Sequence, residues 1–184
     1  IGFCCKFNDP SSGVIDHNLI RDCSLYQHPE VKEYAGKYAH GQYNFMARIP
    51  GDQCFAEKKD CKLWCFGTVF TTKSYIEKTG ETPRRLYASK ILDLITENPK
   101  EITSCIKGSF VLLVWNDHTK VLKIITDRHN VLPLYYYQNG QSIYISSAIP
   151  VLVKMADLTP EIDPAGLASQ LIFDYPIRDL HYIK

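Results

Sequence analysis

The order of strand-like and helical segments predicts an α+β domain whose sheet is at least partly antiparallel. Strand-like apolar segments at 109–115 and 121–126 flank four polar residues, NDHT, a composition that suits a hairpin turn. A second hairpin is predicted around Asn139-Gly140, because this dipeptide readily adopts the positive φ of tight turns. Helical spacing of apolar residues precedes these hairpins, so helices and strands are expected in one layered unit.

Residues 1–7 are nearly all apolar and predict a first strand, which ends at an Asn-Asp-Pro turn. Residues 11–62 show no lasting period, and loops with short strands are expected there. The segment 63–70 is rich in aromatic and β-branched residues and predicts another strand. Gly67 inside it indicates a turn, a bulge or a close approach of backbones.

Three helices are predicted from start and stop signals in the sequence. The first spans about 72–78 and is closed by Gly80. The second is expected to start at Thr82-Pro83, with Pro at the first helical position and Pro99 limiting its length. The third starts at Asp163-Pro164. The apolar stripe of the second helix is formed by Leu86, Ile91, Leu94 and Ile95.

Composition excludes several classes of function. The chain of 184 residues carries 21 Lys and Arg against 20 Asp and Glu, without a basic block, so nucleic-acid binding is not expected. No apolar run is long enough for a membrane span, and residues 1–7 lack the features of a signal peptide. The sequence therefore predicts a compact protein of the cytoplasm.

Seven cysteines at irregular spacing argue against a secreted disulfide framework, so most should be reduced thiols. A metal or redox module built on Cys54, Cys61 and Cys65 is one alternative, although no CxxC pair accompanies them. The simpler interpretation is that Cys65, between Trp64 and Phe66, is a small core residue.

The run Asp127-Arg128-His129 combines a carboxylate, a guanidinium and an imidazole. Neighbouring residues of a strand point to opposite faces, so the three side chains cannot converge on one substrate without a turn. We interpret the run as structural, with an Asp–Arg charge pair that fixes the loop before Pro133.

Two longer motifs are more specific. GSFVLLVWND at 108–117 and TDRHNVLPLYY at 126–136 resemble the G-x-F-A-x-x-x-W-D and D-R-x-G-x-x-P-L-Y-Y blocks in the N-terminal glutaminase domain of asparagine synthetases. The similarity continues through 143–150, 158–165 and 173–176 and covers close to the whole chain. It implies the sandwich of N-terminal-nucleophile hydrolases, with four layers in the order α/β/β/α and two antiparallel sheets.

The resemblance also implies a domain organisation. Residues 1–160 would form the glutaminase-like sandwich, and residues 161–184 would begin a linker and helix leading to an ATP-dependent synthetase domain. The pyrophosphate-binding loop S-G-G-x-D-S of that second domain does not occur in the sequence. No cofactor is expected in the sandwich itself, and ATP and Mg²⁺ would belong to the synthetase domain.

The family's catalytic positions align with unsuitable residues. A processed N-terminal Cys supplies nucleophile and base in active members, and here Ile1 aligns with it. Phe66 replaces the Asn that holds the oxyanion, although Gly67 is retained. Ala88 takes the place of the Asp that recognises the substrate amine. Arg48 is considered for the arginine that binds the substrate carboxylate, although the surrounding MARI matches the motif poorly.

These positions predict a catalytically degenerate glutaminase-like domain with a structural role in a larger amide-forming ligase. β-Lactam synthetases and lasso-peptide cyclases are relatives with such a degenerate domain, and they need no ammonia. The alternative is an active glutaminase with a non-standard nucleophile such as Cys4 or Cys5. Expected partners are the C-terminal synthetase domain and a second copy in a homodimer, with an apolar docking surface around Ile149, Val151, Leu152 and the helix at 164–173.

Overall fold

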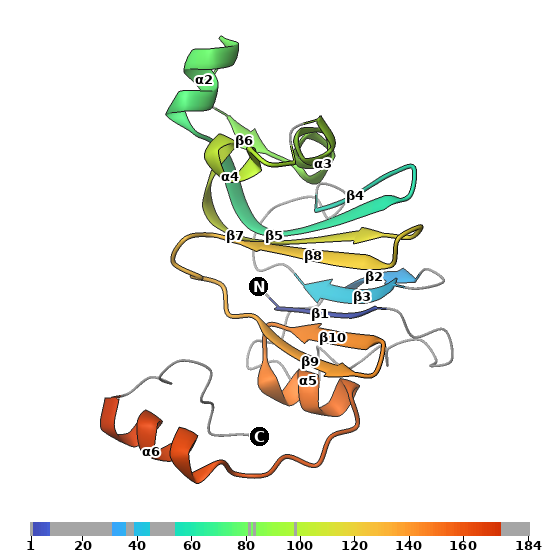
Figure 1. Ribbon diagram of the computed structural model, residues 1–184, viewed down its shortest axis with the longest axis vertical. Coiled ribbons are helices and arrows are strands. Elements are labelled where there is room, and N and C mark those ends of the chain that lie inside the picture. The colour runs from blue at the N-terminus through green and yellow to red at the C-terminus, as the bar shows by residue number, and fades with distance from the viewer. Residues whose placement is uncertain are drawn as a thin grey trace.

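The computed structural model describes residues 2–7, 31–35, 39–44, 54–80, 82, 84–97 and 99–173. Two sheets lie face to face with helices on both outer sides, which confirms the predicted four layers (Figure 1). Every strand pairing in this part of the chain is antiparallel. The fold is therefore a β-sandwich with helices covering the outer faces of its two sheets.

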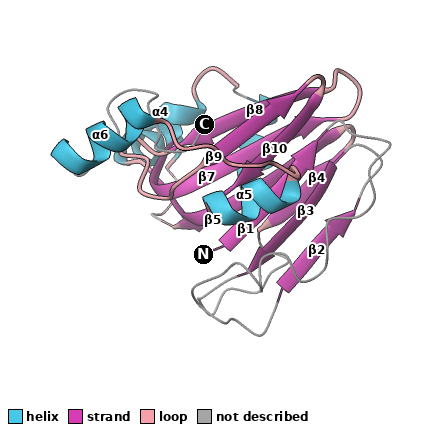
Figure 2. Ribbon diagram, turned by 90° about the horizontal axis from the view of Figure 1, so that it is seen from below, coloured by secondary structure: helices cyan, strands magenta, loops and turns pink. Residues whose placement is uncertain are grey.

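The first sheet has the order β2-β3-β1-β10-β9 and places the N-terminal strand at its centre. Its strands are β1 (Gly2–Phe7), β2 (Val31–Ala35), β3 (Ala39–Asn44), β9 (Tyr135–Asn139) and β10 (Ser142–Ser146). Helix α5 (Ile149–Met155) lies across its outer face, and α6 (Pro164–Phe173) follows at the end of an extended connection (Figure 2).

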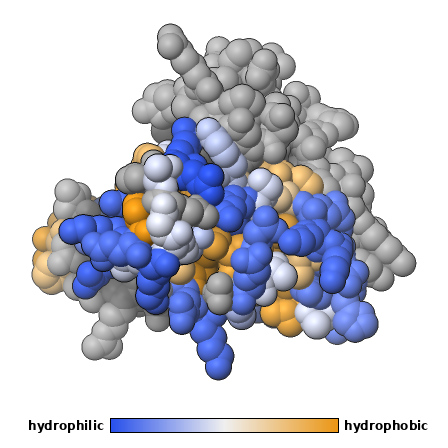
Figure 3. Space-filling model, turned by 90° about the horizontal axis from the view of Figure 1, so that it is seen from above, coloured by the Kyte–Doolittle hydropathy of each residue, from blue (hydrophilic) through white to orange (hydrophobic). Residues whose placement is uncertain are grey.

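The second sheet has the order β4-β5-β7-β8, with the short β6 paired to β5. Its strands are β4 (Phe55–Lys58), β5 (Cys61–Thr71), β6 (Arg85–Leu86), β7 (Ile106–Asn116) and β8 (Val121–Thr126). The helices α2 (Lys73–Thr79), α3 (Ala88–Glu97) and α4 (Ile102–Cys105) lie on its outer side. Seen from that side, the described surface is mainly hydrophilic (Figure 3).

The alternation of side chains along β5 and β7 produces two separate cores. One lies between the sheets and the other between the second sheet and α3, whose buried stripe includes Ile91, Leu94 and Ile95, as predicted. The residues of the inter-sheet core are Phe3, Cys5, Phe7, Cys54, Trp64, Phe66, Val111, Leu113, Trp115 and Ile145. Any site built from the inward positions of β1 and β5 must therefore lie among these side chains.

Most predicted elements are confirmed, but the second helix begins later than expected. It starts at Ala88, because Arg85 and Leu86 pair with Phe70 and Val69 as β6 instead. Leu86 is buried in the predicted cluster, but it reaches the cluster from a strand and not from the helix.

The predicted apolar surface is confirmed only for α6. Val151 and Leu152 are buried, and Val151 packs with Cys4 of the first sheet, so their predicted exposure is wrong. By contrast, Leu167, Leu171, Ile172 and Phe173 are exposed on α6. No helix in the described part of the chain is long and apolar enough to cross a membrane.

Candidate functional site

The aligned catalytic positions that the structure describes fall on the middle of β5 and the start of α3. Phe66, Gly67 and Ala88 are described, whereas Ile1 and Arg48 lie outside the described residues. The geometry of the candidate site is therefore built from Phe3, Phe66 and the groups around them.

Two aromatic rings fill the space between the sheets at this place. Phe3 of β1 and Phe66 of β5 stack in parallel, with ring centroids 4.0 Å apart and planes 3° apart. They are 1% and 0% exposed, respectively. In the family alignment an amide side chain at position 66 would face a developing oxyanion, but here the ring at that position stacks on another hydrocarbon ring. Neither ring can donate a hydrogen bond to a substrate.

Hydroxyl groups at the end of β10 hold the backbone at the start of β1. Ser147 Oγ accepts a hydrogen bond from Phe3 N at 3.0 Å, and Ser147 N donates to Phe3 O at 3.0 Å. Ser146 Oγ also donates to Phe3 O at 3.2 Å and accepts from Ala148 N at 3.1 Å. These hydrogen bonds give both hydroxyls a structural role and hold the backbone of Phe3, whose ring stacks on Phe66.

Gly67 has a structural reason to be glycine. Its φ is +94°, and a Cβ there would lie 2.2 Å from Ser109 O and 2.8 Å from Leu132 Cδ1. The predicted close backbone approach is therefore present, between β5 and β7. Because this packing alone requires glycine, the retention of Gly67 does not by itself indicate an oxyanion site.

Asp127 anchors the loop that brings Leu132 to Gly67. Its side chain accepts hydrogen bonds from the backbone N–H groups of Phe110 (3.1 Å), His129 (2.9 Å) and Val131 (3.3 Å). The predicted structural role of the run 127–129 agrees with this geometry, but the predicted Asp–Arg charge pair is wrong. The carboxylate is 7% exposed and is satisfied by amide groups, while Arg128 lies on the surface.

Ala88 belongs to a different part of the molecule from Phe66. It is fully buried in the core between the second sheet and α3, whereas Phe66 belongs to the inter-sheet core. The structure therefore does not bring the aligned oxyanion and substrate-amine positions into one pocket lined by these two side chains.

Cys4 and Cys5, considered as nucleophiles, are buried on opposite faces of β1. Cys5 lies in the inter-sheet core, and burial, followed by the neighbouring Cys4, raises its pKa well above the usual value. Cys4 lies on the opposite face, in a cluster with Val151. A neutral thiol enclosed by hydrocarbon is a poor nucleophile.

The proposed metal module also lacks suitable geometry. Cys61 and Cys65 are four residues apart on β5, which corresponds to roughly 13 Å along a strand. Burial, and secondarily Cys54, raises the pKa of Cys65 to about 12, while Arg85 lowers it slightly. Cys65 is buried in the outer core, as its flanking residues predicted. Among the described residues, no group of three or more His, Cys, Asp or Glu side chains could hold a metal ion.

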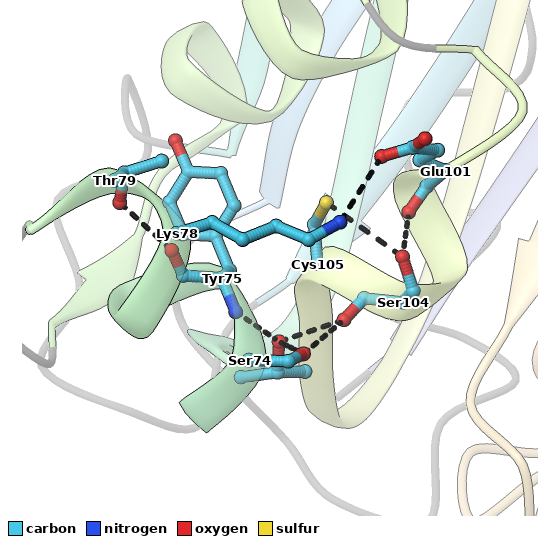
Figure 4. Close-up of polar contacts among 8 residues, drawn as sticks. Ser74, Tyr75, Lys78, Thr79, Glu101, Ser104 and Cys105 are labelled. Carbon is cyan, nitrogen blue, oxygen red and sulfur yellow. Dashed lines mark hydrogen bonds and ion pairs between the residues drawn. The ribbon is translucent and has the colours of Figure 1, made fainter.

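A second polar cluster joins α2 to α4 (Figure 4). Thr72 Oγ1 donates to Ser104 O at 2.7 Å and accepts from Tyr75 N at 3.3 Å, which also caps α2. Lys78 lies 3.9 Å from the Glu101 carboxylate, and both side chains are largely exposed. The Cys105 thiol lies 3.9 Å from the hydroxyl of Ser104, and the Cys105 carbonyl accepts a hydrogen bond from Thr72 N at 2.9 Å. The cluster fixes the two short helices and offers no activated group.

Comparison with known proteins identifies the family. The glutamine amidotransferase domain family matches residues 51–183, and the chain belongs to it, with the architecture of a class II domain. Among solved structures, glutamine phosphoribosylpyrophosphate amidotransferase from B. subtilis, in complex with ADP and GMP, has a TM-score of 0.47 and 15% identity. That match covers 89% of this chain and 39% of the other. A search of curated proteins found no match.

Sequence reasoning missed two features of this region. They are the stacking of Phe3 on Phe66 and the backbone N–H groups that donate hydrogen bonds to Asp127. Alternation in 1–7 and 63–70 could have indicated that both phenylalanines face inward. It could not have paired them, because the pairing depends on how the sheets are superposed.

Proposed function

We propose that this chain is a glutamine amidotransferase-type domain that no longer hydrolyses glutamine. The observation that carries the proposal is the Phe3–Phe66 stack, which occupies the inter-sheet position where the family alignment requires a polar oxyanion donor. A pocket for glutamine at this position would need both rings to move out of the core. Such a movement would cost several kcal/mol of burial free energy.

The role that remains for such a domain is structural. We infer that it forms the N-terminal part, residues 1–160, of a larger asparagine-synthetase-like enzyme that makes an amide bond at the expense of ATP. Residues 161–184 would lead to the synthetase domain, which would bind ATP and Mg²⁺. The exposed apolar side chains of α6 support a contact with that domain. Six free cysteines among the described residues support a cytoplasmic location.

The alternative, hydrolysis through Cys4 or Cys5, is disfavoured by burial. Both thiols are 0% exposed, and Cys5 is held in its protonated form by the apolar core. A nucleophile must instead reach the substrate carbonyl and have a base within hydrogen-bonding distance. Neither condition is met by the described surroundings of Cys5.

The direct test is incubation of the purified chain with glutamine and, separately, with a diazoketone analogue of glutamine that alkylates catalytic cysteines. We expect no release of ammonia above the buffer rate and no mass increase of the protein. Ammonia release together with stoichiometric labelling mapped to Cys4 or Cys5 would establish the alternative. A cysteine-alkylating reagent without the glutamine moiety, applied after unfolding, provides the positive control for labelling.

A further inference from the structure

A row of cationic and aromatic side chains crosses three strands of the second sheet. Phe70 of β5 pairs directly with Arg85 of β6 on one side and with Lys107 of β7 on the other. Directly paired residues of an antiparallel ladder project from the same face. The Arg85 guanidinium also lies 6.0 Å from the ring centroid of Tyr87, within the range of a cation–π contact. We call these four residues the Phe70 row.

The Phe70 row lies on the face of β5 that carries Phe66, four residues further along the strand. Unlike Phe66, it is accessible to solvent. Phe70 is 42% exposed and Tyr87 is 40% exposed, while Lys107 is exposed and Arg85 is partly exposed. Large aromatic side chains are more often buried, so an exposed Phe70 between two cations, with an exposed Tyr87 near one of them, forms an unusual surface.

The two cations of the row are not neutralised by the acidic residues of the described chain. None of the ion pairs within the described ranges involves Arg85 or Lys107. Two strand spacings separate the backbones of these residues, which corresponds to about 10 Å. The surface thus presents two positively charged side chains from strand positions about 10 Å apart, with Phe70 at the strand position between them.

We propose that the Phe70 row is a docking surface for an acidic, extended segment of a partner protein. In a polyproline II segment, residues three apart lie on the same face at about 9 Å. This spacing is close to the backbone separation of about 10 Å between Arg85 and Lys107. Carboxylates at these two positions would pair with the two cations. An apolar or proline residue between the two carboxylates would cover Phe70 and Tyr87. Extended proline-rich peptides dock on aromatic surfaces of peptide-recognition domains in the same way.

Charge and shape favour a peptide over other anions. Two cations on a chain of net charge +1 provide little of the electrostatic attraction that nucleic-acid binding requires. The row is a partly exposed strip across adjacent strands, whereas small-molecule sites are concave and bury most of the ligand. The proposal does not depend on the loss of glutamine hydrolysis, because the row is distinct from the buried Phe3–Phe66 stack.

The test is selection of a displayed random peptide library on the immobilised chain, with the double variant Arg85→Gln/Lys107→Gln as the counter-target. We expect enriched peptides to contain two acidic residues three positions apart. A synthetic peptide of that consensus, measured by fluorescence anisotropy, should lose about tenfold or more in affinity on the double variant. Phe70→Ala should weaken binding several-fold, and added salt should weaken it further.

Lys73→Gln is the matched control, because Lys73 is 88% exposed on α2, outside the row. It should leave the affinity unchanged, and thermal melting should show that all variants remain folded. Three results would overturn the proposal: no peptides that distinguish the chain from the double variant, enriched peptides without acidic residues, or equal loss of affinity in the Lys73 variant. Binding of oligo(dT) with the same dependence on Arg85 and Lys107 would assign the row to nucleic acid instead.

Discussion

Under the proposed function, the side chain of Phe66 has two roles, because it closes the glutamine site and stabilises the fold. Its ring lies between the two sheets and stacks on Phe3, which the hydroxyls of Ser146 and Ser147 hold in place. The contact that excludes a substrate under the proposed function therefore also contributes to the free energy of unfolding. The two contributions can be separated by substitution.

We expect Phe66→Ala to lower the free energy of unfolding by about 3–5 kcal/mol, since it removes a fully buried ring. A double-mutant cycle with Phe3→Ala should give a coupling of about 0.5–1.5 kcal/mol for the stacked pair. Urea denaturation of the four proteins measures both quantities. Phe70→Ala is the control, and it should lower the free energy of unfolding much less, because Phe70 is 42% exposed. Equal costs at 66 and 70 would contradict the assignment of Phe66 to the core.

Restoring a nucleophile alone is expected to fail. In Ile1→Cys with a free N-terminus, Phe66 would still replace the oxyanion donor, a loss of roughly 10²–10³ in rate. Ammonia release from glutamine by Ile1→Cys is the measurement, with Ile1→Ser as the control. Appreciable turnover by Ile1→Cys would mean that the pocket is intact.

A triple variant that adds Phe66→Asn and Ala88→Asp is the wider test of the aligned positions. If the alignment alone determines activity, this variant should hydrolyse glutamine where Ile1→Cys does not. The burial of Ala88 in the outer core argues against this rescue, because a carboxylate there would be enclosed by hydrocarbon. We therefore expect the triple variant to be inactive and less stable than Ile1→Cys. Turnover confined to it would show that Ala88 can face the substrate.

Asp117 gives the stability of the chain a defined dependence on pH. Partial burial raises its pKa, but hydrogen bonds from Lys62 and Trp115 outweigh this effect, and the pKa lies below the usual 3.8. A lowered carboxyl pKa stabilises the fold above the unfolded-state pKa, and this stability is lost as the pH falls through the folded-state value. Asp117→Asn should therefore lower the free energy of unfolding by about 1–3 kcal/mol near neutral pH. Below about pH 4 this loss should become progressively smaller.

Urea denaturation of wild type and Asp117→Asn at neutral and acid pH tests this expectation. Asp93→Asn is the control, because the Lys58–Asp93 pair is exposed and should contribute little. A cost of Asp117→Asn that stays constant from neutral to acid pH would show that the ionised carboxylate is not the cause.

At the scale of elements, the loop from Asp127 to Leu134 depends on a single carboxylate. Asp127→Ala leaves three backbone N–H groups without their acceptor. Each group that stays buried and unpaired lowers the free energy of unfolding by about 1–3 kcal/mol. We expect faster hydrogen exchange at the amides of Phe110, His129 and Val131 and a lower melting temperature. Arg128→Ala, at an exposed position, should change neither. If both variants behaved alike, an Asp–Arg pair would be the better account of the loop.

Elements with local signals were predictable from the sequence. The β9–β10 hairpin forms around Asn139-Gly140, with Gly140 at φ +58°, and α2 ends at Gly80 in the left-handed conformation. Helix α6 begins where Asp163 accepts a hydrogen bond from Ala165 N, as its N-cap position predicted. Each of these features depends on residues within a few positions of one another.

Elements defined by distant partners were not predictable in the same way. β6 exists because Arg85 and Leu86 pair with β5, and this pairing replaced the helix expected from Thr82-Pro83. α5 lacks a side-chain cap at Ala148, and its burial of Val151 depends on contact with the first sheet. Of the candidate site, Phe66 and Gly67 were located correctly on a strand, but the contact with Phe3 arises only when the sheets are superposed.

At the scale of the whole molecule, the layers leave one element unlike the rest. α2, α3 and α4 present a mainly hydrophilic outer face, whereas α6 presents a hydrophobic surface at the end of an extended connection. An ordinary surface helix buries its apolar stripe. The exposed apolar side chains of α6 therefore support the proposed contact with another domain or copy.

We expect the isolated chain to self-associate through α6, because Leu171 and Ile172 are 77% and 71% exposed. Sedimentation velocity over a range of concentrations should show a dimer or larger species, and Leu171→Glu/Ile172→Glu should remain monomeric without a loss of thermal stability. Val121→Glu is the matched control, since Val121 is an exposed apolar residue on β8, outside α6, and its substitution should not alter the association. A wild-type chain that stays monomeric at every concentration, or a double variant that still associates, would show that α6 is not a contact surface. A double variant that unfolds would show that Leu171 and Ile172 pack within the chain itself.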